Sequence, residues 1–132
     1  LILYCYLFRM KRIAIYGAGG FGKEVRGMLE MSGGKFSFAG FIDDYKSNVQ
    51  SPEEDQYDDV LLAIANPQIR AKLIESWSRR EVPFESFISD DVLFHPSVKV
   101  DKGVIICPGV KATVDITIGD FSIININATI GH

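Results

Sequence analysis

The chain has 132 residues, of which 47% are hydrophobic, and its 14 basic and 17 acidic residues give a net charge of −3. This composition can bury a core, which excludes a disordered protein. No run of lysine and arginine gathers on a stretch that would track a phosphate backbone, which argues against nucleic acid as a partner. The two cysteines, Cys5 and Cys107, lack the spacing of a disulfide framework or a zinc site, so we expect no metal and a reducing cytoplasm.

Residues 1–9 begin with the apolar run LILYCYLF. Eight apolar residues are too few to span a bilayer, and no basic segment precedes them as in a signal peptide. We therefore expect no membrane insertion. Because Met10 directly precedes a strand-like run, the fold is predicted to begin there, and residues 1–9 are interpreted as a leader or non-native extension.

The first part of the predicted fold is a strand, a glycine turn and a helix. KRIAIY (11–16) is an apolar, β-branched run that leads into GAGGFG (17–22). Val25, Met28 and Leu29 then follow at helical spacing, which predicts an amphipathic helix.

Two more strands and a second helix are predicted next. FSFAGFIDD (36–44) reads as a strand that closes on two aspartates, and VLLAIA (60–65) follows an acidic loop as a third, buried strand. A helix is predicted from Asn66-Pro67 to about Arg80, because proline is favoured in the first turn of a helix. Its apolar stripe consists of Ile69, Leu73, Ile74 and Trp77. Three strands alternating with two helices predict a parallel sheet.

From about residue 89 a period of six replaces the helical period. One column of every sixth residue is apolar throughout: Phe94, Val100, Ile106, Ala112, Ile118, Ile124 and Ile130. A second column is small or β-branched apart from one serine: Val98, Val104, Val110, Ile116, Ser122 and Ala128. A six-residue unit cannot bury its own apolar side, so the units must stack into a solenoid, whose handedness the period leaves open.

A nucleotide site is the leading interpretation of the glycine turn. Gly17, Gly19 and Gly22 satisfy G-x-G-x-x-G between a strand and a helix, where backbone amides can approach a diphosphate. Asp43 and Asp44 follow the second strand, where they can accept hydrogen bonds from a ribose or a base. The alternative is a tight structural turn with solvated carboxylates. A mononucleotide fits this small domain better than a dinucleotide.

The remaining candidates are weaker or lie in the solenoid. Asn66 and Arg70 fall on the sheet edge where ligands collect, and Arg70 is either a phosphate partner or part of a solvated helix face. His95 is expected to cap a turn, and Cys107 to be structural because no basic neighbour lowers its pKa. His132 falls at a turn position, so its ring should project outward.

Five segments together carry a resemblance to a known family: GAGGFGKEV, FIDD, IANPQIR, FHPSV and the hexapeptides that end in NATIGH. Over residues 11–132 the chain resembles the bacterial sugar acetyltransferases of the sialic acid O-acetyltransferase and UDP-amino-sugar N-acetyltransferase family. The resemblance implies a small Rossmann-like α/β domain (10–88), followed by a left-handed parallel β-helix with three hexapeptides per coil (89–132), and assembly as a trimer.

The resemblance also implies an activity and its residues. Acetyl-CoA would donate an acetyl group to an amine or hydroxyl of a nucleotide-linked sugar, with His132, in the family's IGH position, as the general base. The predicted substrate-binding residues are Gly17, Ala18, Gly19, Gly20, Phe21, Gly22, Asp43, Asp44, Asn66 and Arg70. The sequence leaves open whether UDP or CMP carries the sugar and whether nitrogen or oxygen is acetylated.

Members of the family continue beyond this histidine with an acidic residue that orients it and with coils that bind acetyl-CoA. The resemblance therefore predicts an incomplete β-helix, with most of the donor site in coils that this sequence lacks. An inactive nucleotide-sugar-binding fragment is the alternative to an active transferase. An NAD-dependent oxidoreductase is disfavoured, because a hexapeptide solenoid supplies neither the rest of a dinucleotide site nor a hydride-acceptor pocket.

Overall fold

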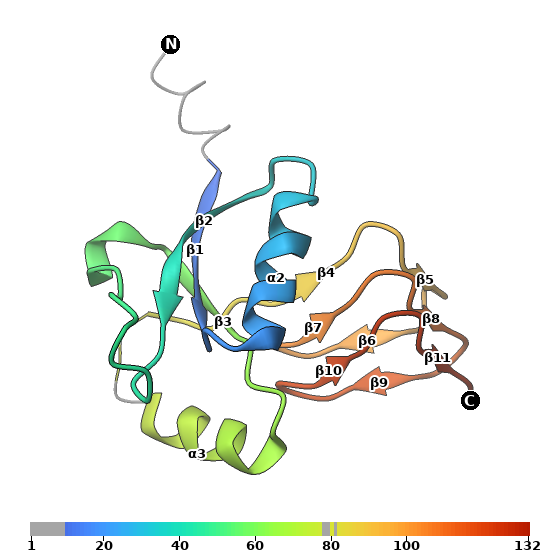
Figure 1. Cartoon of the computed structure of the whole chain (residues 1–132). Helices are drawn as coiled ribbons and strands as arrows, with labels where there is room; N and C mark the ends of the chain where they lie inside the picture. The colour runs from blue at the N-terminus through green and yellow to red at the C-terminus, as the bar shows by residue number, and fades with distance from the viewer. Residues whose placement is uncertain (1–9, 78–79, 81) are drawn as a thin grey trace.

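The computed structural model describes residues 10–77, 80 and 82–132 (Figure 1). The predicted leader, residues 1–9, lies outside the described residues. In the described part of the chain, no helix is long and apolar enough to cross a membrane.

A three-stranded parallel sheet forms the first half of the fold, as predicted. Its strands are β1 (Lys11–Tyr16), β2 (Phe36–Ile42) and β3 (Asp59–Leu62), in the order β2-β1-β3. β3 ends three residues earlier than the predicted strand, because the chain turns toward the next helix once Ala63 N–H has bonded to Tyr16 O at 2.8 Å. The carboxyl ends of all three strands therefore meet at one edge of the sheet.

Two helices cover the sheet. α2 (Gly20–Glu30) buries Val25, Met28 and Leu29, as its spacing predicted. α3 (Pro67–Trp77) buries Leu73 and Trp77, and the predicted continuation to Arg80 crosses residues 78–79, which lie outside the described residues. The prediction for Ile69 was wrong, since this residue is 44% exposed. A single 3₁₀ turn, η1 (Glu54–Gln56), lies in the acidic loop.

The second half of the chain is a left-handed parallel β-helix, as expected. Its two-residue strands are β4 (Phe87–Ile88), β5 (Leu93–Phe94), β6 (Lys99–Val100), β7 (Ile105–Ile106), β8 (Lys111–Ala112), β9 (Thr117–Ile118), β10 (Ile123–Ile124) and β11 (Thr129–Ile130). They stack as β4-β7-β10, β5-β8-β11 and β6-β9. Since Phe87 pairs with Ile105 and Ile105 with Ile123, each coil takes 18 residues, or three hexapeptides.

Both predicted hexapeptide columns supply the interior of the β-helix. Val104, Ile106, Val110 and Ile118 from these columns are buried. Packed against them are Val92, which precedes the columns, and seven further column members: Phe94, Val98, Val100, Ile116, Ile124, Ala128 and Ile130. The period also appears in the backbone, because every sixth residue from 103 to 127 has a positive φ, including three that are not glycine: Asp115, Phe121 and Asn127. These residues therefore occupy the successive corners of the coil, and those 18 residues apart, such as Gly103 and Phe121, stack at the same corner.

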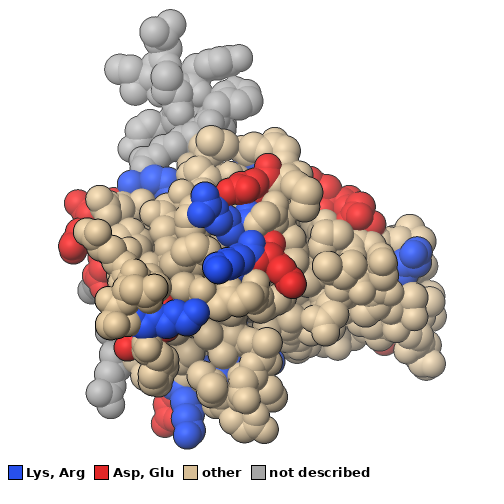
Figure 2. Space-filling model, viewed as in Figure 1, with Lys and Arg blue, Asp and Glu red and all other residues tan. Residues whose placement is uncertain are grey.

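Charged pairs lie at the opposite edge of the sheet from the glycine turn. Lys11 Nζ contacts Asp59 at 2.8 Å and Glu85 at 2.7 Å, and these hydrogen bonds raise the pKa of Lys11 above its ordinary value. The pairs connect β1, β3 and the segment that enters the β-helix. On the face seen in Figure 2, acidic and basic side chains are interspersed, and a wide area over the β-helix carries few charges.

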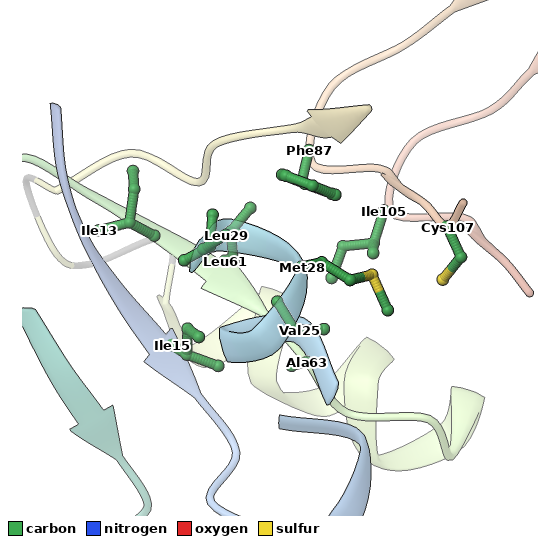
Figure 3. Packing of buried hydrophobic residues seen from close by; sticks show 10 residues of the cluster. All are labelled: Ile13, Ile15, Val25, Met28, Leu29, Leu61, Ala63, Phe87, Ile105 and Cys107. Atoms are coloured by element: carbon green, nitrogen blue, oxygen red, sulfur yellow. The ribbon is translucent and has the colours of Figure 1, made fainter. Parts of the chain in front are cut away.

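One hydrophobic cluster joins the two halves of the molecule (Figure 3). α2 contributes Val25, Met28 and Leu29, which lie between sheet residues on one side and β-helix residues on the other. The sheet residues are Ile13, Ile15, Leu61 and Ala63, and the β-helix residues are Phe87, Ile105 and Cys107. The cluster thus crosses the predicted boundary between residues 88 and 89.

Candidate functional site

The glycine turn lies where β1 ends, and two of its glycines are required by close packing. Gly17 has φ +111°, and its N–H bonds to Ile42 O at 2.8 Å. A Cβ on Gly22 would lie 1.7 Å from Gly17 O, so only glycine lets α2 approach the turn this closely. Gly19 and Gly20 face open space, because a Cβ on either residue would meet nothing within 4 Å.

The N-terminus of α2 is open to a ligand. Its N-cap, Gly19, makes no side-chain capping hydrogen bond, and no acidic residue lies in the first turn. The first N–H groups of a helix have no partner within the helix, and they lie at the positive end of its dipole. A phosphate group would satisfy these amides and would be stabilised by the dipole.

Asp43 holds the glycine turn in place. Its Oδ2 accepts a hydrogen bond from Ala18 N–H at 3.0 Å, and its Oδ1 accepts one from Tyr45 N–H at 3.1 Å. Lys46 Nζ donates to Ala18 O at 3.1 Å, so the backbone of Ala18 is held at both its N–H and its carbonyl. The sequence placed Asp43 at this edge but did not indicate Lys46.

Asp44 is paired with a buried tyrosine. The Tyr16 hydroxyl, at the end of β1, donates to Asp44 Oδ2 at 2.7 Å. Burial, and then the hydrogen bond to Asp44, raise the pKa of Tyr16 above its ordinary value. The hydroxyl therefore stays protonated and serves as a fixed donor that orients one Asp44 oxygen.

A cavity of about 460 Å³ lies next to the turn. It has an apolar part formed by Ile64 and Ile69, and a polar part that holds two lysines and Asp43. Its lining residues are Asp43, Tyr45, Lys46, Ile64, Ile69 and Lys72. Five of these six were missed from the sequence; the one available signal was Ile69, an isoleucine in the first turn of a helix at the ligand-binding edge. The cavity combines a surface for a flat apolar group with charges for an anion.

Asn66 and Arg70 make contacts within the protein. Asn66 Oδ1 accepts hydrogen bonds from Gln68 and Ile69 N–H, both at 3.0 Å, which caps α3. Arg70 donates to the carbonyl oxygens of Ile64, Ala65 and Phe121 at 2.7, 3.0 and 3.1 Å. Burial lowers the pKa of Arg70 from its ordinary value. Contact of either side chain with a substrate stays a prediction.

The remaining residues singled out from the sequence, His95, Cys107 and His132, belong to the β-helix. His132 is exposed, in agreement with the outward orientation expected from its turn position. His95 Nδ1 lies 2.8 Å from Ser97 Oγ and accepts a hydrogen bond from Ser97 N–H, so it caps a turn as expected. Cys107 is buried, and burial raises the pKa of its thiol to about 11. It is a packing residue in the shared hydrophobic cluster.

The fold and this edge together define a class of protein: a Rossmann-like domain with a glycine turn suited to a phosphate, joined to a β-helix of hexapeptide repeats. Comparison with known families agrees. The chain belongs to the PglD N-terminal domain family, whose model matches residues 12–77.

Solved structures share both halves of the fold. A histidine-to-alanine mutant of GDP-perosamine N-acetyltransferase from Caulobacter crescentus, in complex with CoA and GDP-perosamine, matches 93% of this chain with a TM-score of 0.80 and 24% identity. The acetyltransferase domain of PglB from Neisseria gonorrhoeae, in complex with acetyl coenzyme A, matches 94% with a TM-score of 0.77 and 22% identity. WeeI from Acinetobacter baumannii matches 93% with a TM-score of 0.75 and 29% identity.

These structures are longer than this chain. The matches cover 64% of the perosamine enzyme, 66% of the PglB domain and 67% of WeeI. Nearly all of this chain therefore lies within a fold that continues further in those proteins.

Proposed function

We propose that the chain is part of an acetyl-CoA-dependent acetyltransferase that acts on an amino or hydroxyl group of a nucleotide-linked sugar. The observation that carries this proposal is the match of 93% of the chain, including both halves, to one enzyme crystallised with CoA and GDP-perosamine. A glycine turn alone fits many nucleotide-binding proteins, and a β-helix alone fits many transferases. Their combination in this order is much more restrictive.

The nucleotide part of the substrate would bind at the carboxyl edge of the sheet. The backbone N–H groups of Gly19, Gly20 and Phe21 would donate hydrogen bonds to the diphosphate at the start of α2. The base and ribose would then occupy the cavity that Asp43 lines, with Asp44 adjacent in the chain, and Lys46 and Lys72 would offset the phosphate charge. The other residues proposed for substrate binding shape this edge of the sheet: Gly17, Ala18, Gly22 and Asn66.

His132 is proposed as the general base. Its exposed imidazole would take a proton from the sugar amine or hydroxyl as that group attacks the thioester carbonyl of acetyl-CoA. A carbon–nitrogen or carbon–oxygen bond forms, the carbon–sulfur bond breaks, and CoA leaves with its sulfur. The transfer is direct and needs no covalent enzyme intermediate.

The remaining proposals concern assembly and organisation. We propose a Rossmann-like substrate domain at residues 10–88 and a β-helix domain from residue 89, with β4 at the boundary already stacked on the β-helix strands. We also propose a homotrimer and a cytoplasmic location. Most of the acetyl-CoA site is proposed to lie in coils that follow those of this chain, a proposal supported by the 64% coverage of the perosamine enzyme. The same coverage favours a second candidate, a chain that binds a nucleotide sugar without transferring acetyl.

Calorimetric titration of this chain with GDP, UDP, CMP and NAD, followed by an acetyl-transfer assay on a protein that also carries the coils of the donor site, tests both candidates. A transferase binds a nucleoside diphosphate or monophosphate and transfers acetyl, and His132→Ala then removes turnover while the matched control His95→Ala keeps it. Binding without transfer supports the second candidate. Binding of NAD alone, or of no nucleotide, would overturn both.

A further inference from the structure

Arg70 connects the candidate nucleotide site to the β-helix. From the first half of α3, its Nη1 donates to the carbonyl oxygens of Ile64 at 2.7 Å and Ala65 at 3.0 Å. Its Nε donates to the carbonyl oxygen of Phe121 at 3.1 Å. One guanidinium therefore joins the loop after β3 to the second coil, across 51 residues of sequence between Arg70 and Phe121.

The loop held by Arg70 forms a wall of the site. Ile64 lines the cavity, and its Cδ1 would lie 2.8 Å from a Cβ on Gly17. The carbonyl oxygen of Ala63 would lie 2.6 Å from the same position, so the loop and the glycine turn pack tightly together. A shift of this loop would change the cavity and would press on the turn.

The other end of the connection is a specialised corner of the β-helix. Phe121 has φ +58°, an uncommon conformation for a residue with an aromatic side chain. Its backbone is held there by Arg70 and by the bond from its own N–H to Lys102 O at 2.9 Å. Its ring lies against Phe84, with ring centroids 5.3 Å apart in an edge-to-face arrangement.

A row of aromatic rings runs between the same two regions. Tyr16 contacts Trp77 with ring centroids 5.5 Å apart, and Trp77 contacts Phe84 at 5.2 Å. Phe84 then contacts Phe121. Since the Tyr16 hydroxyl bonds to Asp44, the row begins at the acidic part of the candidate site and ends at the corner that Arg70 holds.

We propose that Arg70 is a positioning residue that fixes the wall of the nucleotide cavity relative to the second coil of the β-helix. This inference rests on the proposed function, and it assigns Arg70 a different task from the phosphate contact predicted from the sequence. Arginine suits the task because its planar fork serves several carbonyl oxygens at fixed angles, whereas lysine offers a single flexible ammonium group. Loss of the fork should loosen the wall for every ligand that touches it.

The test compares Arg70→Lys with the control Arg26→Lys, an exposed arginine whose Nε donates to Glu30 at 2.9 Å on α2. Affinities for a nucleoside diphosphate and for the matching nucleoside are measured for both variants and the parent chain. A positioning role predicts that Arg70→Lys weakens both ligands by the same factor, about tenfold for the loss of one to two hydrogen bonds. If Arg70→Lys weakens only the affinity for the diphosphate, Arg70 binds phosphate directly. If neither affinity changes, Arg70 is a purely structural residue. Either result overturns the proposal.

Hydrogen exchange gives a readout that needs no ligand, and so separates this inference from the proposed function. In Arg70→Lys we expect faster exchange at the N–H groups of both Ala63 and Phe121, because both ends of the connection lose a restraint. The N–H of Lys111, bonded to Ala128 O in the far part of the β-helix, should keep its protection and serves as an internal control. Faster exchange at only one of the two ends would refute the connection even if no nucleotide binds.

Discussion

The substitution Gly22→Ala should distort the glycine turn, whereas Gly20→Ala on the same helix should be tolerated. A Cβ at position 22 would lie 1.7 Å from the carbonyl oxygen and 2.8 Å from the carbonyl carbon of Gly17. These are backbone atoms of a residue whose N–H is bonded to Ile42 O, so they cannot move aside as a flexible side chain would. Either α2 or the turn must shift by more than 1 Å to reach the ordinary contact distance of roughly 3.4 Å or more.

The expected cost of Gly22→Ala is about 1–3 kcal/mol of unfolding free energy, the usual range for overpacking a close contact. At this chain length that corresponds to a melting temperature lower by about 4 °C for each kcal/mol. Gly20→Ala adds a methyl group in open space and replaces the poorest ordinary helix former, so it should gain up to about 1 kcal/mol.

Urea denaturation followed by circular dichroism measures both effects. The two variants add the same methyl group to the same helix two residues apart, so their difference isolates the contact with Gly17. If Gly22→Ala unfolds at the same urea concentration as Gly20→Ala, the close approach of α2 to the turn is not what requires glycine, and the packing explanation fails.

Three further outcomes follow from single contacts. Asn66→Ala removes the cap of α3 and should lower the free energy of unfolding by about 1 kcal/mol, while Gln68→Ala in the same turn should change it little. Equal urea denaturation midpoints for the two variants would contradict the capping role. Tyr16→Phe tests stability at alkaline pH. The raised pKa of Tyr16 in the folded state contributes stability that is intact below the ordinary tyrosine pKa of about 10 and is lost as the pH rises above it. Between about pH 8 and 11 the free energy of unfolding should therefore depend less on pH in the variant, and an unchanged slope would refute this. In a Cys5→Ser background, Cys107 should react with a thiol reagent at pH 8 only as fast as the protein unfolds, because its thiol is buried and has a pKa of about 11; rapid reaction of the native protein would contradict this.

The fold was more predictable than the site, for a physical reason. Hydrophobic periodicity reports which residues share a face, and this sufficed for Val25, Met28 and Leu29 on α2 and for both columns of the β-helix. Periodicity does not report how far along a helix the neighbouring elements bury its apolar face. Ile69 fits the stripe of α3, yet it lines the cavity and is 44% exposed, so it does not belong to the core.

The contacts of the site span sequence distances that no local pattern encodes. Lys46 lies in a loop without periodicity, and its bond to Ala18 O crosses 28 residues. Asp43 was placed at the correct edge because it follows a strand, yet its bond to Ala18 N–H was not foreseeable from that position. A motif thus located the edge of the sheet, while the shape and charge of the cavity depend on loops that only the folded chain brings together.

The position of α2 explains why the glycine turn can be both narrow and stable. The helix packs on β1 through Ile13 and Ile15 and on the β-helix through Ile105, within one continuous hydrophobic cluster. Helix α2 is therefore restrained from two sides, and its N-terminal amides keep their direction without a capping side chain. Amides that are already oriented lose less entropy when they bind an anion than amides on a mobile loop would. The β-helix, which would carry the catalytic base, thus also contributes to the rigidity of the site that would hold the nucleotide.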